Sequence, residues 1–176
     1  YKTGSNWGGF IAITLNNLKV GALSYFLGIF IGIGTFYVLL NNCIMLGSFQ
    51  YFFYQRDVFW ESVRGIWIHG SMEIFAMVIE AGAGFILGAS ILFPKTFSRL
   101  ESFKIGFQNS FKIFLSTMPF TFAAGFLEGY VTRYSMEMPT YLSVGIILIT
   151  LSLISFYYLI YPFIVHKKAK KYVSTL

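Results

Sequence analysis

Hydrophobic residues occur in long runs along this chain, and short polar stretches separate them. No Asp, Glu, Lys or Arg falls between Lys19 and Arg56, and none falls between Glu137 and Lys167. These gaps, 36 and 29 residues long, exceed the roughly 20 apolar residues that a helix needs to cross a bilayer. The pattern therefore predicts an all-α, polytopic transmembrane bundle.

The runs divide into spans and shorter amphipathic pieces. Apolar residues at steps of three and four predict a helix in the membrane interface over residues 5–18, or else the end of an upstream spanning helix. Residues 41–56 contain an aromatic cluster and are too polar to cross, so we expect a re-entrant or interfacial segment there, followed by an amphipathic helix over 57–65. The single domain of 1–176 then has four predicted spans: 20–40, 66–93, 107–131 and 140–165.

Composition and charge agree with this class and add a topology. The chain is 56% hydrophobic and 11% charged, which excludes an ordinary soluble domain. With four spans, ten of the 13 Lys and Arg residues fall on the side that holds both ends, which predicts cytoplasmic N- and C-termini. The chain starts at Tyr1 without a signal-peptide pattern, so we expect it to be the C-terminal part of a longer protein.

Small residues recur at four-residue spacing in three of the predicted spans. GxxxG steps of this kind remove side chains from one helix face and let two backbones approach closely. We expect them mainly to pack helices within one bundle, with a homo-oligomer interface as the alternative. The residues are Gly28, Gly32, Gly84, Gly88, Gly125 and Gly129.

Ionisable residues inside the predicted spans are the candidates for function, because charges in hydrocarbon are costly. His69, Glu73 and Glu80 lie close to one face of the second span, and Glu128 lies near the end of the third at the same side of the membrane. Asn41 and Asn42 close the first span on that side. We therefore predict an intramembrane polar cluster of these six residues.

Three uses of such a cluster remain open from the residues alone. It can be a structural clasp between helices, a proton or ion path with Glu80 as the deeper step, or a hydrolytic site with His69 as base or metal ligand. HExxH and GxSxG motifs are absent from the sequence, so we expect no enzyme and assign no catalytic residue, metal or cofactor. The single cysteine, Cys43, excludes an internal disulfide and a cysteine-based zinc cluster.

The basic tail HKKAKKY, residues 166–172, follows the last span directly. Such a position favours contact with anionic lipid over nucleic acid. We therefore expect the lipid bilayer and no nucleic acid among the partners.

Three blocks of sequence, in order, resemble the stage II sporulation protein M family. The run IHGSMEIFAMVIEAGAGFILGASILFP, residues 68–94, is similar to the HGxxE signature of that family. NNLKVGALSYFLGIFIGIGTFYVLLNNCIMLG, residues 16–47, and FAAGFLEGYVT, residues 122–132, resemble its first and third spans. The resemblance covers about residues 10–132 and carries over His69, Gly70 and Glu73 as signature positions, with Glu128 as a weaker match.

The resemblance implies a protein of the bacterial cytoplasmic membrane that acts as an anchor or scaffold without catalysis of its own. The implied partners are other membrane proteins, namely peptidoglycan-processing proteins or RDD-domain proteins, the latter in non-sporulating bacteria. From the sequence we thus predict a scaffold of the cell envelope. The alternative is a transporter or channel subunit that uses the His and Glu cluster.

Overall fold

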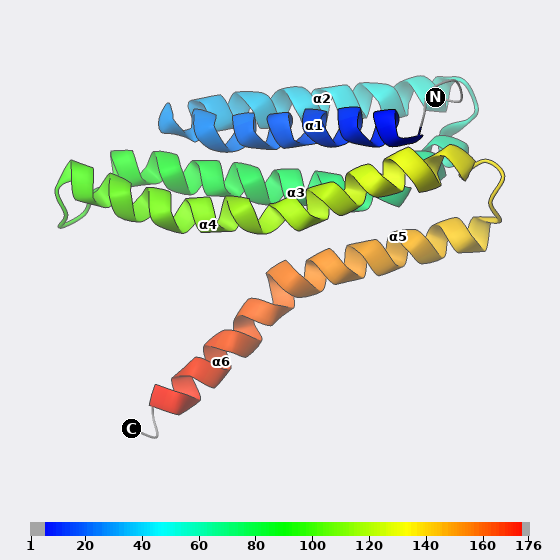
Figure 1. The fold of residues 1–176 in the computed structure, drawn as a ribbon. Coiled ribbons are helices and arrows are strands. Elements are labelled where there is room, and N and C mark those ends of the chain that lie inside the picture. Colours follow the sequence, from blue (N-terminus) through cyan, green and yellow to red (C-terminus); the bar gives the residue numbers. More distant parts are fainter. Residues whose placement is uncertain (1–5, 174–176) are drawn as a thin grey trace.

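The computed structural model describes residues 6–173 and is helical throughout its regular structure (Figure 1). No strand occurs within these residues, so the predicted all-α class is confirmed. Within the described part of the chain, four helices are long and apolar enough to cross a membrane, at Trp7–Ile29, Phe59–Leu92, Arg99–Tyr134 and Thr140–Lys171. The α-helices are α1 (Asn6–Phe26), α2 (Ile33–Gln55), α3 (Phe59–Leu92), α4 (Arg99–Phe126), α5 (Thr140–Ser155) and α6 (Tyr161–Val173).

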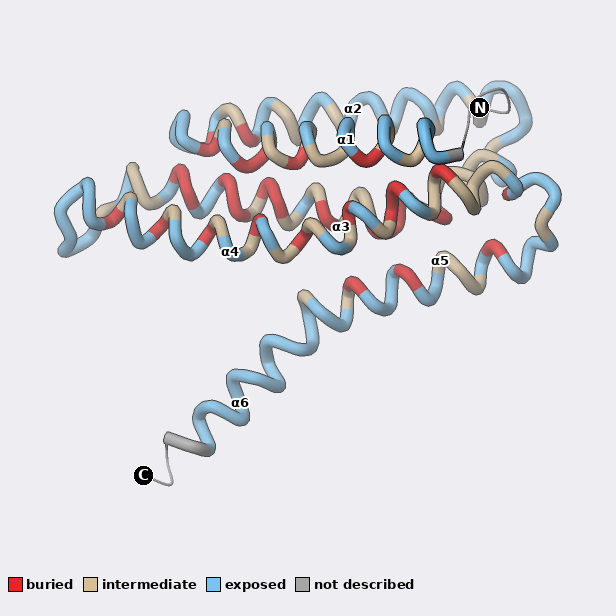
Figure 2. Tube along the Cα trace, viewed as in Figure 1, coloured by how far each residue is buried: buried red, intermediate tan, exposed pale blue. Residues whose placement is uncertain are grey.

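The helices run up and down in layers around α3. Helices α1 and α2 lie side by side on one face of the α3–α4 pair, and α5 lies on the other face (Figure 1). Helix α3 touches α1, α2, α4 and α5, and it holds more buried residues than any other described helix (Figure 2). The helix that carries the predicted signature is thus the centre of the bundle.

The first span differs from its prediction. Helix α1 and a 3-10 turn form one membrane-length segment from Trp7 to Ile29, so the separate interfacial helix 5–18 and the span 20–40 are wrong. The chain reverses direction at Ile31 and Gly32, which both have positive φ, 61° and 82°. The Gly32 amide donates to the Gly28 carbonyl at 2.9 Å, so the backbone of the turn keeps a hydrogen-bond partner and an apolar sequence can reverse here.

Helix α2 also replaces an expected irregular segment. It is continuous from Ile33 to Gln55, so the re-entrant segment 41–56 is wrong, and it runs back along α1. Counting α2, the chain traverses the bundle five times, from α1 to α5. The start of α1 and the end of α6 therefore lie at opposite ends of the bundle (Figure 1), and the prediction that both ends share one side does not fit this arrangement.

All six GxxxG glycines lie where helices touch inside the bundle. A Cβ on Gly28 would collide with the Gly84 carbonyl oxygen, and one on Gly88 would lie 2.8 Å from the Gly28 oxygen. Gly32 packs on the Phe85 ring, Gly125 against Thr14 and Gly129 against Phe10. Backbone-to-backbone contact therefore joins the turn after α1 to α3, and α1 to the end of α4, as expected for small residues in membrane helices.

An aromatic core fills the space between α1 and α4. Tyr25 is fully buried, stacks on Phe114 with 4.8 Å between the ring centroids, and shares a 3.0 Å hydrogen bond with the Ser110 hydroxyl. Phe107 and Phe111 extend the stack along α4. Dispersion contacts of this density hold membrane helices together where water expulsion contributes little.

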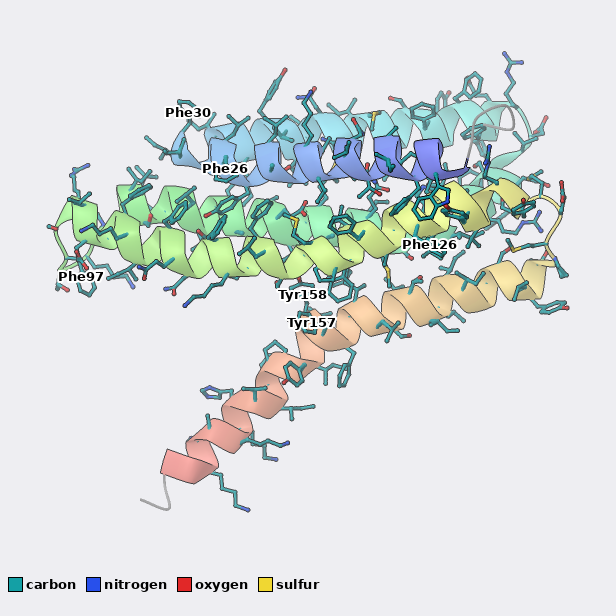
Figure 3. All side chains as sticks on the ribbon, viewed as in Figure 1. Phe26, Phe30, Phe97, Phe126, Tyr157 and Tyr158 are labelled. Carbon is teal, nitrogen blue, oxygen red and sulfur yellow. The ribbon has the colours of Figure 1, made fainter. Side chains whose placement is uncertain are left out.

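Helix α5 attaches to the bundle by hydroxyl pairs, and α6 leaves it. Ser71 and Thr150 share a 2.7 Å hydrogen bond, and the Tyr158 hydroxyl pairs with Ser116 at 2.8 Å. Tyr157 and Tyr158 reach toward α4 at the point where the helix diverges (Figure 3). Beyond the π-helical turn Phe156–Ile160, residues 161–171 of α6 are exposed (Figure 2).

Candidate functional site

Three of the predicted polar residues meet near the end of the bundle where α1 begins. His69 and Glu73 lie one turn apart on α3, and Glu128 lies in a π-helical turn, Leu127–Val131, that continues α4. One nitrogen and two carboxylate oxygens, one atom from each residue, lie within 4.8 Å of one another. His69 Nε2 is 3.8 Å from Glu128 Oε2, and the two side chains are 13% and 16% exposed. The structure thus brings together the group that helical spacing predicted.

A threonine fixes the imidazole ring from its other side. His69 Nδ1 lies 3.0 Å from Thr132 Oγ1, a hydrogen-bond distance. Thr132 immediately follows the π-helical turn that holds Glu128. Turns of this type recur at functional sites because the extra residue redirects side chains. Thr132 was not among the predicted residues, because its place beside His69 depends on the π-helical turn and not on regular helical spacing.

Helix α1 covers the cluster on the side away from α5. Asn17 of α1 lies next to Glu73. The close approach of α1 depends on Gly125 and Gly129. Thr14 packs directly on Gly125, and Phe10 packs on Gly129. Asn17 was not predicted as part of the cluster, because the predicted span began after Lys19. In the structure α1 includes both residues.

Glu80 forms a second, separate polar site about two turns further along α3. Its side chain is 3% exposed, and the Thr117 hydroxyl donates to Oε1 at 2.8 Å. Gly21 of α1 leaves the space that the carboxylate occupies, since a Cβ there would collide with it. Glu80 is therefore enclosed between α1 and α4 and does not belong to the His69 group.

Replacing Thr117 by valine should destabilise the bundle by about 1–3 kcal/mol, because a buried carboxylate loses its hydroxyl donor. Thr121→Val is a matched control one turn later, since the Thr121 hydroxyl donates only to a carbonyl of its own helix among the bonds described, at 3.3 Å. Thermal unfolding in mild detergent measures both. Equal losses in the two variants would show that the Glu80 contact contributes nothing specific.

The structure does not bring Asn41 and Asn42 into the cluster. Both lie in the middle of α2, and each amide donates at 2.8 Å to its own helix, to the Tyr37 and Val38 carbonyls. Asn41 is exposed on the outer face of the bundle. The sequence predicted that a span ends at residue 40, just before these two residues. In the structure the helix ends about ten residues earlier, at Ile31 and Gly32.

These observations define an integral membrane protein built from long apolar helices, with an ionisable group between its central helix and α4. The comparison with known families agrees with this class. The family model of stage II sporulation protein M matches residues 1–133, which include the whole cluster, and the chain belongs to that family. The searches of curated proteins and of solved structures gave no match. Helices α5 and α6 lie beyond the matched residues.

Proposed function

We propose that this protein is a scaffold of the bacterial cytoplasmic membrane that binds other membrane proteins, and that α2 carries the binding surface. One observation carries the proposal. A stripe of side chains, most of them polar or aromatic, follows the face of α2 that points away from the bundle. It consists of Tyr37, Asn41, Ile44, Ser48, Tyr51 and Gln55, all of them exposed.

The spacing of this α2 stripe is that of a helix-pairing seam. Asn41, Ser48 and Gln55 are seven residues apart, and Tyr37, Ile44 and Tyr51 repeat at seven in the alternate positions. Side chains at this three-and-four spacing lie on the contact line of two helices that pack at a shallow left-handed angle. Helix α2 has no helix on that side in the described chain (Figure 1).

The chemistry of the α2 stripe favours a protein partner over lipid. Amide and hydroxyl groups are poorly accommodated by hydrocarbon, whereas Ser, Thr, Asn and Gln bond to each other between membrane helices. The stripe has no charged residue, so the fitting partner is a spanning helix with uncharged polar side chains at matching positions. The family resemblance implies peptidoglycan-processing proteins or RDD-domain membrane proteins as partners.

Charge supports an orientation for this scaffold. Lys95, Arg99 and Lys104 lie at the same end of the bundle as the basic α6, whereas Arg56, Arg64 and Arg133 lie at the other end. The more basic end belongs in the cytoplasm under the positive-inside rule. The α6 tail then lies at the inner membrane surface.

The transporter alternative has less support. A relay would need the His69 group and Glu80 to exchange protons or ions, yet Glu80 is enclosed by Gly21 and Thr117. Its burial fits a structural clasp between α1, α3 and α4.

Site-specific photo-cross-linking in cells tests the α2 stripe. A photoreactive residue at Ser48 should give one cross-linked product, and mass spectrometry identifies the protein in it. Phe49 is the matched control, because it is exposed but lies about 100° around the same helix. Combining Asn41→Leu, Ser48→Leu and Gln55→Leu should reduce co-purification of that same protein roughly 20-fold, at about 0.6 kcal/mol for each interhelical hydrogen bond lost.

Two outcomes would contradict the proposal. Equal cross-linking at Ser48 and Phe49 would show that the stripe faces lipid. A product that contains only a second copy of this chain would replace partner binding by self-association.

A further inference from the structure

The His69 group has the composition and spacing of a metal site. It supplies one imidazole nitrogen and two carboxylate oxygens, from two different helical segments, within 4.8 Å of one another. We propose that His69, Glu73 and Glu128 bind one divalent transition-metal ion, with Zn²⁺ as the best-fitting ion. No metal is predicted from the sequence, and this site is independent of the scaffold proposal.

The distances suit an ion between the side chains. Zinc binds nitrogen and carboxylate oxygen at about 2.0–2.2 Å, so two ligand atoms in a tetrahedral site lie about 3.4 Å apart. His69 Nε2 and Glu128 Oε2 are 3.8 Å apart, which is too long for a hydrogen bond and close to that separation. Side-chain movements of about 1 Å would complete the site.

The imidazole is oriented for ligation. When Nδ1 donates its proton to Thr132 Oγ1, at 3.0 Å, the lone pair of Nε2 faces Glu128 and is free for a metal. A histidine ligand that is held through its other ring nitrogen is the usual arrangement in metal proteins. Thr132 is therefore a positioning residue of this site.

Charge balance also favours a divalent ion. Two ionised carboxylates carry two negative charges, and one divalent cation between them offsets both while the imidazole stays neutral. Imidazole together with carboxylate suits Zn²⁺ and similar transition metals, whereas Mg²⁺ and Ca²⁺ prefer oxygen alone.

Access distinguishes this group from Glu80. The side chains of His69 and Glu128 are 13% and 16% exposed, whereas Glu80 is buried. The His69 group therefore reaches the surface of the bundle, and Glu80 does not. The bound ion would join α3 to the end of α4, and three protein ligands leave a fourth position for water.

Metal analysis of the purified protein tests this site. The full chain is purified in mild detergent with a tag that contains no histidine, is equilibrated with Zn²⁺ and is desalted. We expect about one zinc per chain, and loss of that zinc in Glu73→Gln and in Glu128→Gln. Glu80→Gln, a buried carboxylate on the same helix, and His166→Ala, the other histidine of the sequence, should keep it. Thr132→Val should weaken zinc affinity about 10–100-fold.

A second readout covers variants that fail to fold. Cobalt(II) bound to wild-type protein should show visible ligand-field absorption of a low-coordinate nitrogen and oxygen site, and added zinc should displace it. The proposal is overturned if wild type binds no more zinc than folded Glu73→Gln, if His166→Ala alone removes the zinc, or if cobalt gives only the spectrum of the hydrated ion.

Discussion

Replacing Gly84 by leucine is expected to prevent stable assembly of the bundle. A Cβ at this position would already collide with the Thr35 hydroxyl and lies 3.1 Å from the Tyr25 carbonyl oxygen. Neither the backbone of α1 nor the buried Thr35 of α2 can move aside without losing the contacts at Gly28. Overpacking a tight site costs about 3 kcal/mol or more when the new side chain is this large.

The matched control lies two residues earlier on the same helix. A Cβ on Gly82 meets nothing within 4 Å, so Gly82→Leu should leave thermal stability unchanged or raise it by about 1 kcal/mol through better helix propensity. Size-exclusion chromatography after heating in mild detergent compares the two variants. If Gly84→Leu survives heating as well as Gly82→Leu does, the backbone contact between the α1 turn and α3 is not required.

Tyr25→Ala is expected to cost about 3–5 kcal/mol, the range for deleting a buried aromatic ring. Tyr25 is fully buried, and its ring stacks on Phe114. Its removal opens a cavity between α1 and α4 that the rigid helices cannot close. Tyr25→Phe, which loses only the hydrogen bond to Ser110, should cost about 1 kcal/mol.

Phe30→Ala is the control, because it removes an aromatic ring that is not buried in the core. Phe30 lies just after the same helix and is 63% exposed, so its ring contributes little to packing. Thermal unfolding should rank the variants Phe30→Ala, Tyr25→Phe and Tyr25→Ala from mildest to most severe. A Tyr25→Ala protein as stable as Phe30→Ala would show that the aromatic stack does not hold α1 to α4.

Hydropathy was sufficient for the class of fold and for three of the spans, but it missed the reversal at Ile31 and Gly32. The turn lies inside an apolar run, and the amides of Phe30, Gly32 and Ile33 donate to nearby carbonyls, so no polar residue marks it. Lys19 misplaced the start of a span. Because a charge is not expected inside a span, the predicted span began after Lys19, at residue 20. In the structure Lys19 is exposed on α1, where a long side chain can extend toward water.

The candidate site was predictable where it depended on spacing within one helix. His69 and Glu73 follow from a one-turn separation, and Glu128 from its depth in an antiparallel span. Asn17 and Thr132 could not be found in this way, because their positions depend on how α1 packs and on a local change of helix type. Asn41 and Asn42 were placed with the cluster because the helix boundary was wrong.

The π-helical turn at Leu127–Val131 limits how this segment can vary in length. One residue corresponds to about 100° around a helix, so a deletion that restored regular α-helix would swing Thr132 away from His69. A one-residue insertion would misdirect it as well. Side chains in this stretch can be exchanged, but an insertion or a deletion would separate the His69 imidazole from Thr132.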